Sequence, residues 1–210
     1  MISHTYRCIF VHIPKTGGSS IEDLIWPPRH LRTTSDLWMG LIDGRRNKYQ
    51  TGGLQHLQAS QIKAEVGCDV FNRYFKFSIV RNPWDKVISQ YVYMTQRKDL
   101  MNYIGMNPGD DLKSYLHLIA RSPHVQWADQ LGFLTDKDEN LLVDYVGRFE
   151  DFEQSVHSVA DSIGIQVSSI PHQKKGQRGR YQNYYDPESI EMVRKMYHRD
   201  IKAFGYEYDA

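Results

Sequence analysis

Residues 7–26, Arg7-Cys8-Ile9-Phe10-Val11-His12-Ile13-Pro14-Lys15-Thr16-Gly17-Gly18-Ser19-Ser20-Ile21-Glu22-Asp23-Leu24-Ile25-Trp26, predict a strand, a glycine-containing loop and a helix in direct succession. The first six residues are short, β-branched and mostly apolar, as in a buried parallel strand. Ile21, Leu24 and Ile25 have the spacing of one helical face, and Pro27-Pro28 ends that helix.

The same pattern recurs further along the chain. Residues 75–80 predict a second strand, and Pro83 suits the first position of a helix that runs to about Gln96. Residues 141–149 predict a third strand, followed by a helix over 150–163. The other elements expected are helices at 59–66, 111–121 and 187–204, with loops at 29–55, 100–110 and 168–185. Alternating strands and helices indicate one α/β domain over residues 1–210, with a central, mainly parallel sheet flanked by helices.

Composition narrows the class of protein. The 210 residues carry 26 Lys and Arg against 25 Asp and Glu, a net charge of +1, which argues against a general nucleic-acid binder. Two cysteines, Cys8 and Cys68, cannot form a disulfide framework or a four-cysteine zinc site. The sequence has no apolar run of membrane-spanning length and no signal-peptide pattern. We therefore expect a cytoplasmic protein with no nucleic-acid or membrane partner.

The first loop has the residues of an anion site. Gly17 and Gly18 allow backbone N–H groups to converge at a helix N-terminus, and Lys15 adds a full positive charge. Hydroxyl donors come from Thr16, Ser19 and Ser20. Because Lys15 precedes both glycines, the loop does not match the Gly-x-x-x-x-Gly-Lys-Ser/Thr motif that binds ATP with magnesium, and no metal is expected. A plain strand-to-helix turn could use the same residues.

The second loop, Arg81-Asn82-Pro83, follows the strand at 75–80. Arg81 could offer a planar fork to a phosphate, and Ser89 lies two turns into the next helix. The alternative is an arginine that pairs with Asp85 and a serine that is only polar surface. Since ligands of parallel sheets bind beyond the carboxyl ends of the strands, both loops should lie at one edge.

Together the two segments resemble the sulfotransferases that use 3′-phosphoadenosine 5′-phosphosulfate. The first is similar to that family's 5′-phosphosulfate loop, and the second to its 3′-phosphate motif, an arginine followed eight residues later by a serine. Similar elements extend to the C-terminus, at 55–62, 144–150 and 204–207, and look most like carbohydrate sulfotransferases of the heparan 2-O-sulfotransferase type and small bacterial relatives. The resemblance implies a P-loop-like, three-layer fold.

The resemblance also implies roles for individual residues. Lys15 would contact the 5′-phosphosulfate and polarise the bridging oxygen, and Thr16, Gly17, Gly18, Ser19 and Ser20 would hold the 5′ group. Arg81 and Ser89 would hold the 3′-phosphate. In the basic loop, Lys174, Lys175 and Arg178, with Arg180, would close over the 3′-phosphate and adenine. The alternative for that loop is a solvated charge run.

Transfer to an alcohol needs a base, and histidine suits it because its ordinary pKa lies near neutral pH. The resemblance assigns His56, with His172 as the next candidate and His12 as a structural neighbour of the loop. Three aromatic residues, Trp84, Tyr181 and Tyr184, could stack on a base or sugar but equally suit a core. Arg148 and Glu150 could form a scaffold salt bridge or contact the substrate.

The expected activity is sulfuryl transfer to a hydroxyl-bearing small molecule or oligosaccharide. Residues 27–55 and 97–135 would face the acceptor. Two alternatives stay open from the sequence: a kinase-like phosphotransferase that uses ATP, and a non-catalytic relative that binds a nucleotide or glycan.

Overall fold

The computed structural model describes residues 1–40, 53–167, 169–170 and 179–209. Within these ranges a single sheet forms, in the order β1-β2-β3-β4. Strands β2, β3 and β4 are parallel, and β1 pairs antiparallel with β2. The strands span Ile2–Ser3 (β1), Cys8–Phe10 (β2), Phe75–Val80 (β3) and Tyr145–Arg148 (β4). The mainly parallel α/β sheet is thus confirmed, whereas the antiparallel edge strand β1 was not predicted.

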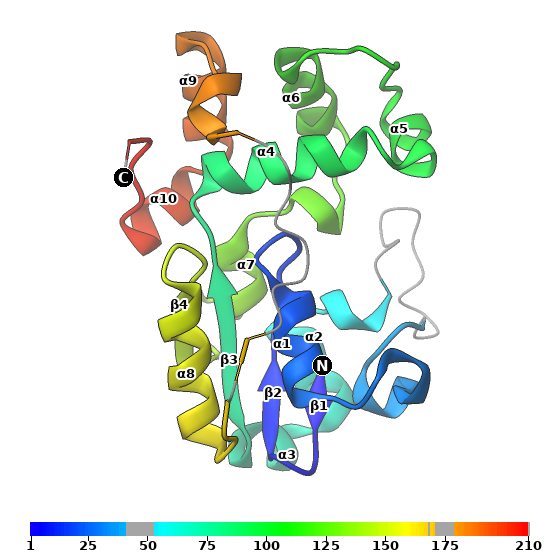
Figure 1. Cartoon of the computed structure of the whole chain (residues 1–210), viewed down its shortest axis with the longest axis vertical. Helices are drawn as coiled ribbons and strands as arrows, with labels where there is room; N and C mark the ends of the chain where they lie inside the picture. The colour runs from blue at the N-terminus through cyan, green and yellow to red at the C-terminus, as the bar shows by residue number, and fades with distance from the viewer. Residues whose placement is uncertain (41–52, 168, 171–178, 210) are drawn as a thin grey trace.

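Helices surround this sheet (Figure 1). The α-helices are α1 (Gly18–Ile25), α2 (Ala59–Val66), α3 (Cys68–Arg73), α4 (Pro83–Met94), α5 (Lys98–Ile104), α6 (Leu112–Arg121), α7 (Gln130–Leu134), α8 (Phe152–Ile163), α9 (Pro187–Met196) and α10 (His198–Phe204). Short 3₁₀ turns are η1 (Arg29–Leu31), η2 (Thr34–Asp36), η3 (Leu54–His56), η4 (Val125–Trp127) and η5 (Tyr181–Tyr184).

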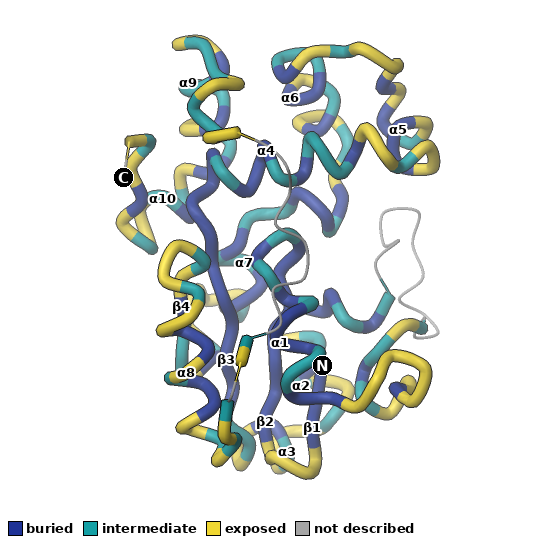
Figure 2. Tube along the Cα trace, viewed as in Figure 1, coloured by how far each residue is buried: buried dark blue, intermediate teal, exposed yellow. Residues whose placement is uncertain are grey.

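The alternation of side chains along the strands produces three layers. Ile9 and Val11 pack with apolar residues of α2, α3 and α7 on one side of the sheet. Phe10 and Phe77 pack with α1 and α8 on the other side. Figure 2 shows the result, with β2 and β3 buried between exposed outer helix surfaces.

A third apolar cluster lies beyond the carboxyl ends of the strands. It contains buried residues of α4, α5, α6, η4 and α9, with Trp84, Tyr115 and Leu116 almost fully buried. Figure 1 shows α4 crossing above the end of β3. This helical layer covers one side of the edge at which both predicted loops lie.

Three predicted elements differ from the structure. The helix expected over 187–204 is two helices, because Tyr197 leaves helical geometry at φ −115°, ψ 27°. The first part of the loop expected over 100–110 is helix, since α5 runs to Ile104 and ends at Gly105 in left-handed conformation. The strand expected over 141–149 is only four residues long, and Leu141 instead forms an isolated bridge with Thr135.

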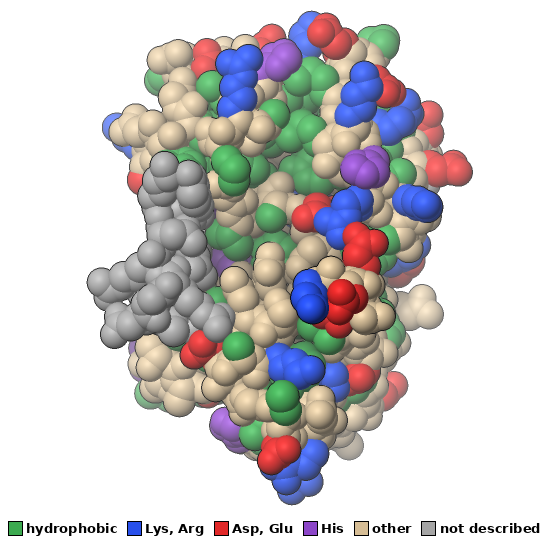
Figure 3. All heavy atoms as spheres, turned by 180° about the vertical axis from the view of Figure 1, so that it is seen from behind, with side chains coloured by type: hydrophobic (Ala, Val, Ile, Leu, Met, Phe, Trp, Pro, Cys, Tyr) green, Lys and Arg blue, Asp and Glu red, His purple; other side chains and the backbone are tan. Residues whose placement is uncertain are grey.

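Surface charge is mixed on the face that Figure 3 shows, where Lys and Arg side chains lie beside Asp and Glu side chains rather than in one broad basic patch. In the described part of the chain, no helix combines the length and apolar character needed to cross a membrane.

Candidate active site

The β2–α1 loop leads directly into the N-terminus of α1. Lys15 and Gly17 both have left-handed backbones, with φ of +69° and +83°, a geometry that turns successive N–H groups toward one point. Gly17 is the N-cap of α1, no side chain caps the helix, and its first turn has no acidic residue. A phosphate or sulfate group would therefore meet backbone N–H groups that no side chain caps, and the positive end of the helix dipole.

Both glycines of this loop are required by close packing. A Cβ on Gly18 would lie 2.0 Å from His12 Nε2, and one on Gly17 would lie 2.7 Å from Phe152 Cε2. The hydroxyl of Thr16 is fully buried and donates to the Ile13 carbonyl at 2.9 Å. Because the hydroxyl proton is used in this hydrogen bond within the loop, the backbone N–H is the group of Thr16 that could bind an anion.

Arg81 connects the two predicted loops. Its Nη1 donates to the Lys15 carbonyl oxygen at 2.9 Å, and its guanidinium lies 3.9 Å from the centre of the Phe149 ring. The pairing of Arg81 with Asp85, considered from the sequence as the alternative, is also present, with Nη2 to Oδ2 at 2.6 Å. Because β2 and β3 are adjacent and parallel, their following loops meet, as the sequence predicted.

The start of α4 differs from the start of α1, because side chains of the protein already accept from two of its backbone N–H groups. The Asn82 side chain accepts from the Trp84 N–H at 3.1 Å, and Glu150 accepts from the Asn82 N–H at 2.7 Å. An anion at this second loop would thus be held by side chains, of which Arg81 and Ser89 are the ones that the sequence predicted.

Tyr93 is a site neighbour that the sequence analysis missed. The ammonium group of Lys15 lies 4.4 Å from the centre of its ring, a cation–π contact. Tyr93 is four residues after Ser89 in α4, so the two side chains share one helical face. That spacing was the available signal, and it places Ser89 on the face of α4 toward Lys15.

His56 lies against the end of β2. Its Nδ1 is 3.0 Å from the His12 carbonyl oxygen, and since a carbonyl only accepts, Nδ1 carries the proton and Nε2 keeps its lone pair. Burial, then the nearby His12, lowers the pKa of His56 to about 3. His56 is therefore neutral, in the tautomer that can accept a proton at Nε2.

His12 belongs to a buried charged network beside the loop. Its Nδ1 is 2.8 Å from Glu22 Oε1, close enough for an ion pair although not aligned for a hydrogen bond. Glu22 Oε2 also accepts from Arg32 at 3.0 Å, and the Arg32 side chain is fully buried. Packed against Gly18 in this way, His12 supports the loop.

The remaining predicted residues divide into scaffold and undescribed groups. Trp84 is 1% exposed and donates to the Ile190 carbonyl, so it belongs to the core. Arg148 donates to the Phe204 carbonyl, and Glu150 accepts from Tyr206 as well as from Asn82. Tyr181 donates to the Tyr208 carbonyl, whereas Tyr184 is exposed.

Four predicted residues lie outside the described part of the chain: the basic-loop residues Lys174, Lys175 and Arg178, and the candidate base His172.

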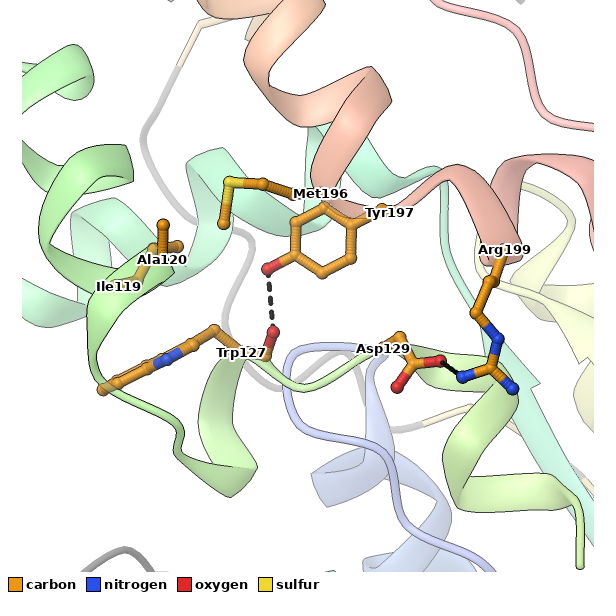
Figure 4. Close-up of a pocket in the computed structure, with 7 residues that line it drawn as sticks. All are labelled: Ile119, Ala120, Trp127, Asp129, Met196, Tyr197 and Arg199. Carbon is orange, nitrogen blue, oxygen red and sulfur yellow. Dashed lines mark hydrogen bonds and ion pairs between the residues drawn. The ribbon is translucent and has the colours of Figure 1, made fainter. Parts of the chain in front are cut away.

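A hollow of about 430 Å³ opens elsewhere, between α6, η4 and the α9–α10 junction (Figure 4). Its lining includes Trp127, Tyr197 and the Asp129–Arg199 ion pair, but none of the residues predicted for the site. Size alone therefore does not make it the place of the chemistry, for which the β2–α1 and β3–α4 loops have the suitable groups.

Two individual proteins are similar to this chain. An uncharacterised protein of Archaeoglobus fulgidus is 28% identical over 110 residues, which are 52% of this chain and 83% of that protein. A crystal structure of a sulfotransferase from Alicyclobacillus acidocaldarius covers 95% of this chain and 98% of its own, with 15% identity and a TM-score of 0.39.

A family model described as the sulfotransferase family matches residues 1–207. This match includes both loops, the segment around His56 and the C-terminal helices. The chain belongs to the sulfotransferase family.

Proposed function

We propose that this chain transfers a sulfuryl group from 3′-phosphoadenosine 5′-phosphosulfate to the hydroxyl of a saccharide. The contact between Arg81 Nη1 and the Lys15 carbonyl supports this proposal most strongly. This contact joins the Arg81 guanidinium, which suits one phosphate, to the β2–α1 loop, which suits a second anionic group. The proposed donor has two such groups, the 5′-phosphosulfate and the 3′-phosphate.

The proposed reaction forms a bond between the acceptor oxygen and sulfur and breaks the bond between sulfur and the 5′-phosphate oxygen. Lys15 and the first-turn N–H groups of α1 would stabilise the negative charge that develops on the departing phosphate. Arg81 and Ser89 would hold the 3′-phosphate, so that the reacting groups are aligned before transfer.

His56 would accept the acceptor's proton at Nε2. In the structure its pKa of about 3 reflects burial and the neighbouring His12. An anionic ligand beside the ring would favour the imidazolium form and raise this pKa toward neutral pH, where a general base is most effective. The His12 carbonyl would keep Nδ1 protonated and the ring fixed throughout.

Calorimetric titration of adenosine 3′,5′-bisphosphate without metal, compared with ATP and magnesium, tests the donor site. We expect the bisphosphate to bind more tightly. Arg81→Ala should lose about 2 kcal/mol, as when a charged hydrogen-bond partner is removed. Arg121→Ala, at an exposed position in α6, is the matched control and should bind normally.

If ATP with magnesium binds more tightly, the kinase-like alternative replaces this proposal. If the bisphosphate binds but no sulfuryl transfer occurs over a broad panel of saccharide and other hydroxyl acceptors, a non-catalytic binding protein is the better description. With an active acceptor, His56→Ala should abolish most turnover while the bisphosphate affinity stays within a few-fold of the original.

A further inference from the structure

The backbone of Arg81 is held by the side chain of Gln130. The Arg81 N–H donates to Gln130 Oε1 at 2.8 Å, and Gln130 Nε2 donates to the Arg81 carbonyl at 2.8 Å. Gln130 is completely buried. One amide side chain therefore satisfies both backbone polar groups of the residue proposed to recognise the 3′-phosphate.

This contact takes the place of a neighbouring strand. The ladder between β3 and β4 ends at Val80 and Arg148, so Arg81 is the first residue beyond it. An amide group that both donates and accepts presents the same pair of groups as a peptide unit of an adjacent strand. Gln130 thus restrains the φ and ψ of Arg81, and with them the direction in which its side chain leaves the sheet.

Gln130 is itself fixed from the C-terminal part of the chain. Asp200 of α10, also fully buried, accepts from the N–H groups of Gln130 and Leu131 at 2.8 and 2.9 Å. Figure 4 shows a second connection next to it, where Arg199 pairs with Asp129 at 2.7 Å. Both contacts hold the start of α7 against α10.

The same segment is tied to α4, the helix that follows Arg81. The buried Lys86 donates to the Ala128 carbonyl at 3.1 Å. The turn that carries Arg81 therefore lies between segments joined by buried hydrogen bonds, and none of the bonds that hold Gln130 from α10 uses the Arg81 side chain.

We propose that Gln130 is a positioning residue that sets the preference of the site for a nucleotide with a 3′-phosphate, by fixing the backbone of Arg81. This inference rests on the proposed function. A group that only stabilised the fold would affect every nucleotide alike, whereas a group that aims Arg81 affects recognition of the 3′-phosphate most.

The test compares the affinities for adenosine 3′,5′-bisphosphate and adenosine 5′-monophosphate in the intact chain, by calorimetry. Gln130→Met keeps the length and volume of the side chain but removes both hydrogen bonds. We expect about tenfold weaker binding of the bisphosphate, the effect of about one lost hydrogen bond, and a clearly smaller loss for the monophosphate, which reaches Arg81 only through its contact with the Lys15 carbonyl. Gln90→Met is the matched control, since Gln90 is buried in α4 and its amide has no hydrogen-bond partner among the described residues.

A double-mutant cycle sharpens the test. In the Arg81→Ala background, Gln130→Met should cause no further loss of bisphosphate affinity, because the side chain that it positions is gone. If Gln130→Met fails to fold, Asp200→Asn, which weakens the support of Gln130, is measured in the same way and should show the same selective loss.

An equal loss for both nucleotides, or no loss for either, overturns the inference and leaves the proposed function intact. A wild-type chain that does not distinguish the bisphosphate from the monophosphate overturns both. Selective loss of bisphosphate binding that disappears in the Arg81→Ala background supports the role of Gln130.

Discussion

Gly18 of the β2–α1 loop packs directly against the ring of His12. Its backbone does not need a positive φ, so the requirement for glycine comes from space alone: a Cβ would lie 2.0 Å from His12 Nε2. The His12 ring is held in place by Glu22 on one side and is stacked on Phe10. It therefore has little room to withdraw.

Gly18→Ala should reduce the free energy of unfolding by about 1–3 kcal/mol or more, as for overpacking of a tight interior, and should weaken binding of the bisphosphate. Urea denaturation and calorimetry measure the two effects. Gly179→Ala is the control, because a Cβ there meets nothing closer than 3.6 Å. Equal stability of both variants would show that the His12 ring moves freely.

His56 makes stability depend on pH in a defined direction. Its pKa falls from 6.5 in the unfolded chain to about 3 in the folded protein, mainly through burial. As the pH falls below 6.5, His56 therefore becomes protonated in the unfolded state but stays neutral in the folded state. The stability contribution is complete above that pH and is lost progressively toward pH 3.

Between about pH 7.5 and about pH 5, this linkage should cost the wild type about 2 kcal/mol of unfolding free energy. His56→Gln, which keeps an N–H donor for the His12 carbonyl, should reduce the loss by about that amount in urea titrations at the two pH values. Some dependence of the unfolding free energy on pH should remain, because burial also lowers the pKa of His124 to about 4. His157→Gln, at an exposed position in α8, should leave the slope unchanged; if it matches His56→Gln, burial of His56 is not the cause.

The segment from Pro27 to Gly40 is attached to α1 by a buried ion pair. Arg32 donates to Glu22 and Asp23 of α1 and to the Pro27 carbonyl, and its guanidinium stacks 4.9 Å from the Trp38 ring. Since α1 begins at the loop predicted to bind an anion, the same helix connects that loop to the segment predicted to face the acceptor.

Arg32→Met should destabilise the protein by about 3–5 kcal/mol, because Glu22 would stay buried without its guanidinium partner. Chemical denaturation measures the effect. Arg29→Met is the control: its side chain is 47% exposed and lies 3.8 Å from Asp23, so its loss should cost at most about 1 kcal/mol. Similar values for the two variants would mean that the Arg32 pair contributes no more than a surface contact.

The C-terminal helices link distant parts of the whole molecule. Tyr197, at the break between α9 and α10, is 3% exposed and donates to the Trp127 carbonyl at 2.8 Å (Figure 4). Burial raises the pKa of this phenol above its ordinary value. Three residues later, Asp200 supports the start of α7.

Tyr197→Phe should lower the free energy of unfolding by about 1–3 kcal/mol, because a buried carbonyl loses its donor while the ring packing is kept. Thermal or urea unfolding of Tyr184→Phe, at an exposed tyrosine, provides the comparison and should match the wild type. If the unfolding free energy of Tyr197→Phe equals that of the wild type, the break between α9 and α10 does not depend on this hydrogen bond.

Local patterns were sufficient to predict much of the architecture. The units at 7–26 and 75–96 could be predicted because short apolar runs, helical spacing and Pro83 at a helix start act over a few residues. The proximity of Lys15 and Arg81 could also be predicted, because adjacent parallel strands have their carboxyl ends at the same edge of the sheet. The break at Tyr197 was missed because the apolar spacing of Ile190, Val193, Tyr197, Ile201 and Phe204 is the same for one helix as for two helices that share a core.

The sequence by itself was enough to predict the two strand–loop–helix units, an anion site in the first loop, and Lys15, Arg81 and His56 as candidate site residues. The folded chain added what holds them: Gln130 on the backbone of Arg81 across 49 residues, and the His12 carbonyl on His56 across 44. Periodicity and capping report interactions between near neighbours, whereas a buried amide or imidazole can satisfy any polar group that packing brings to it. Which group that is depends on how all three apolar clusters fill space together.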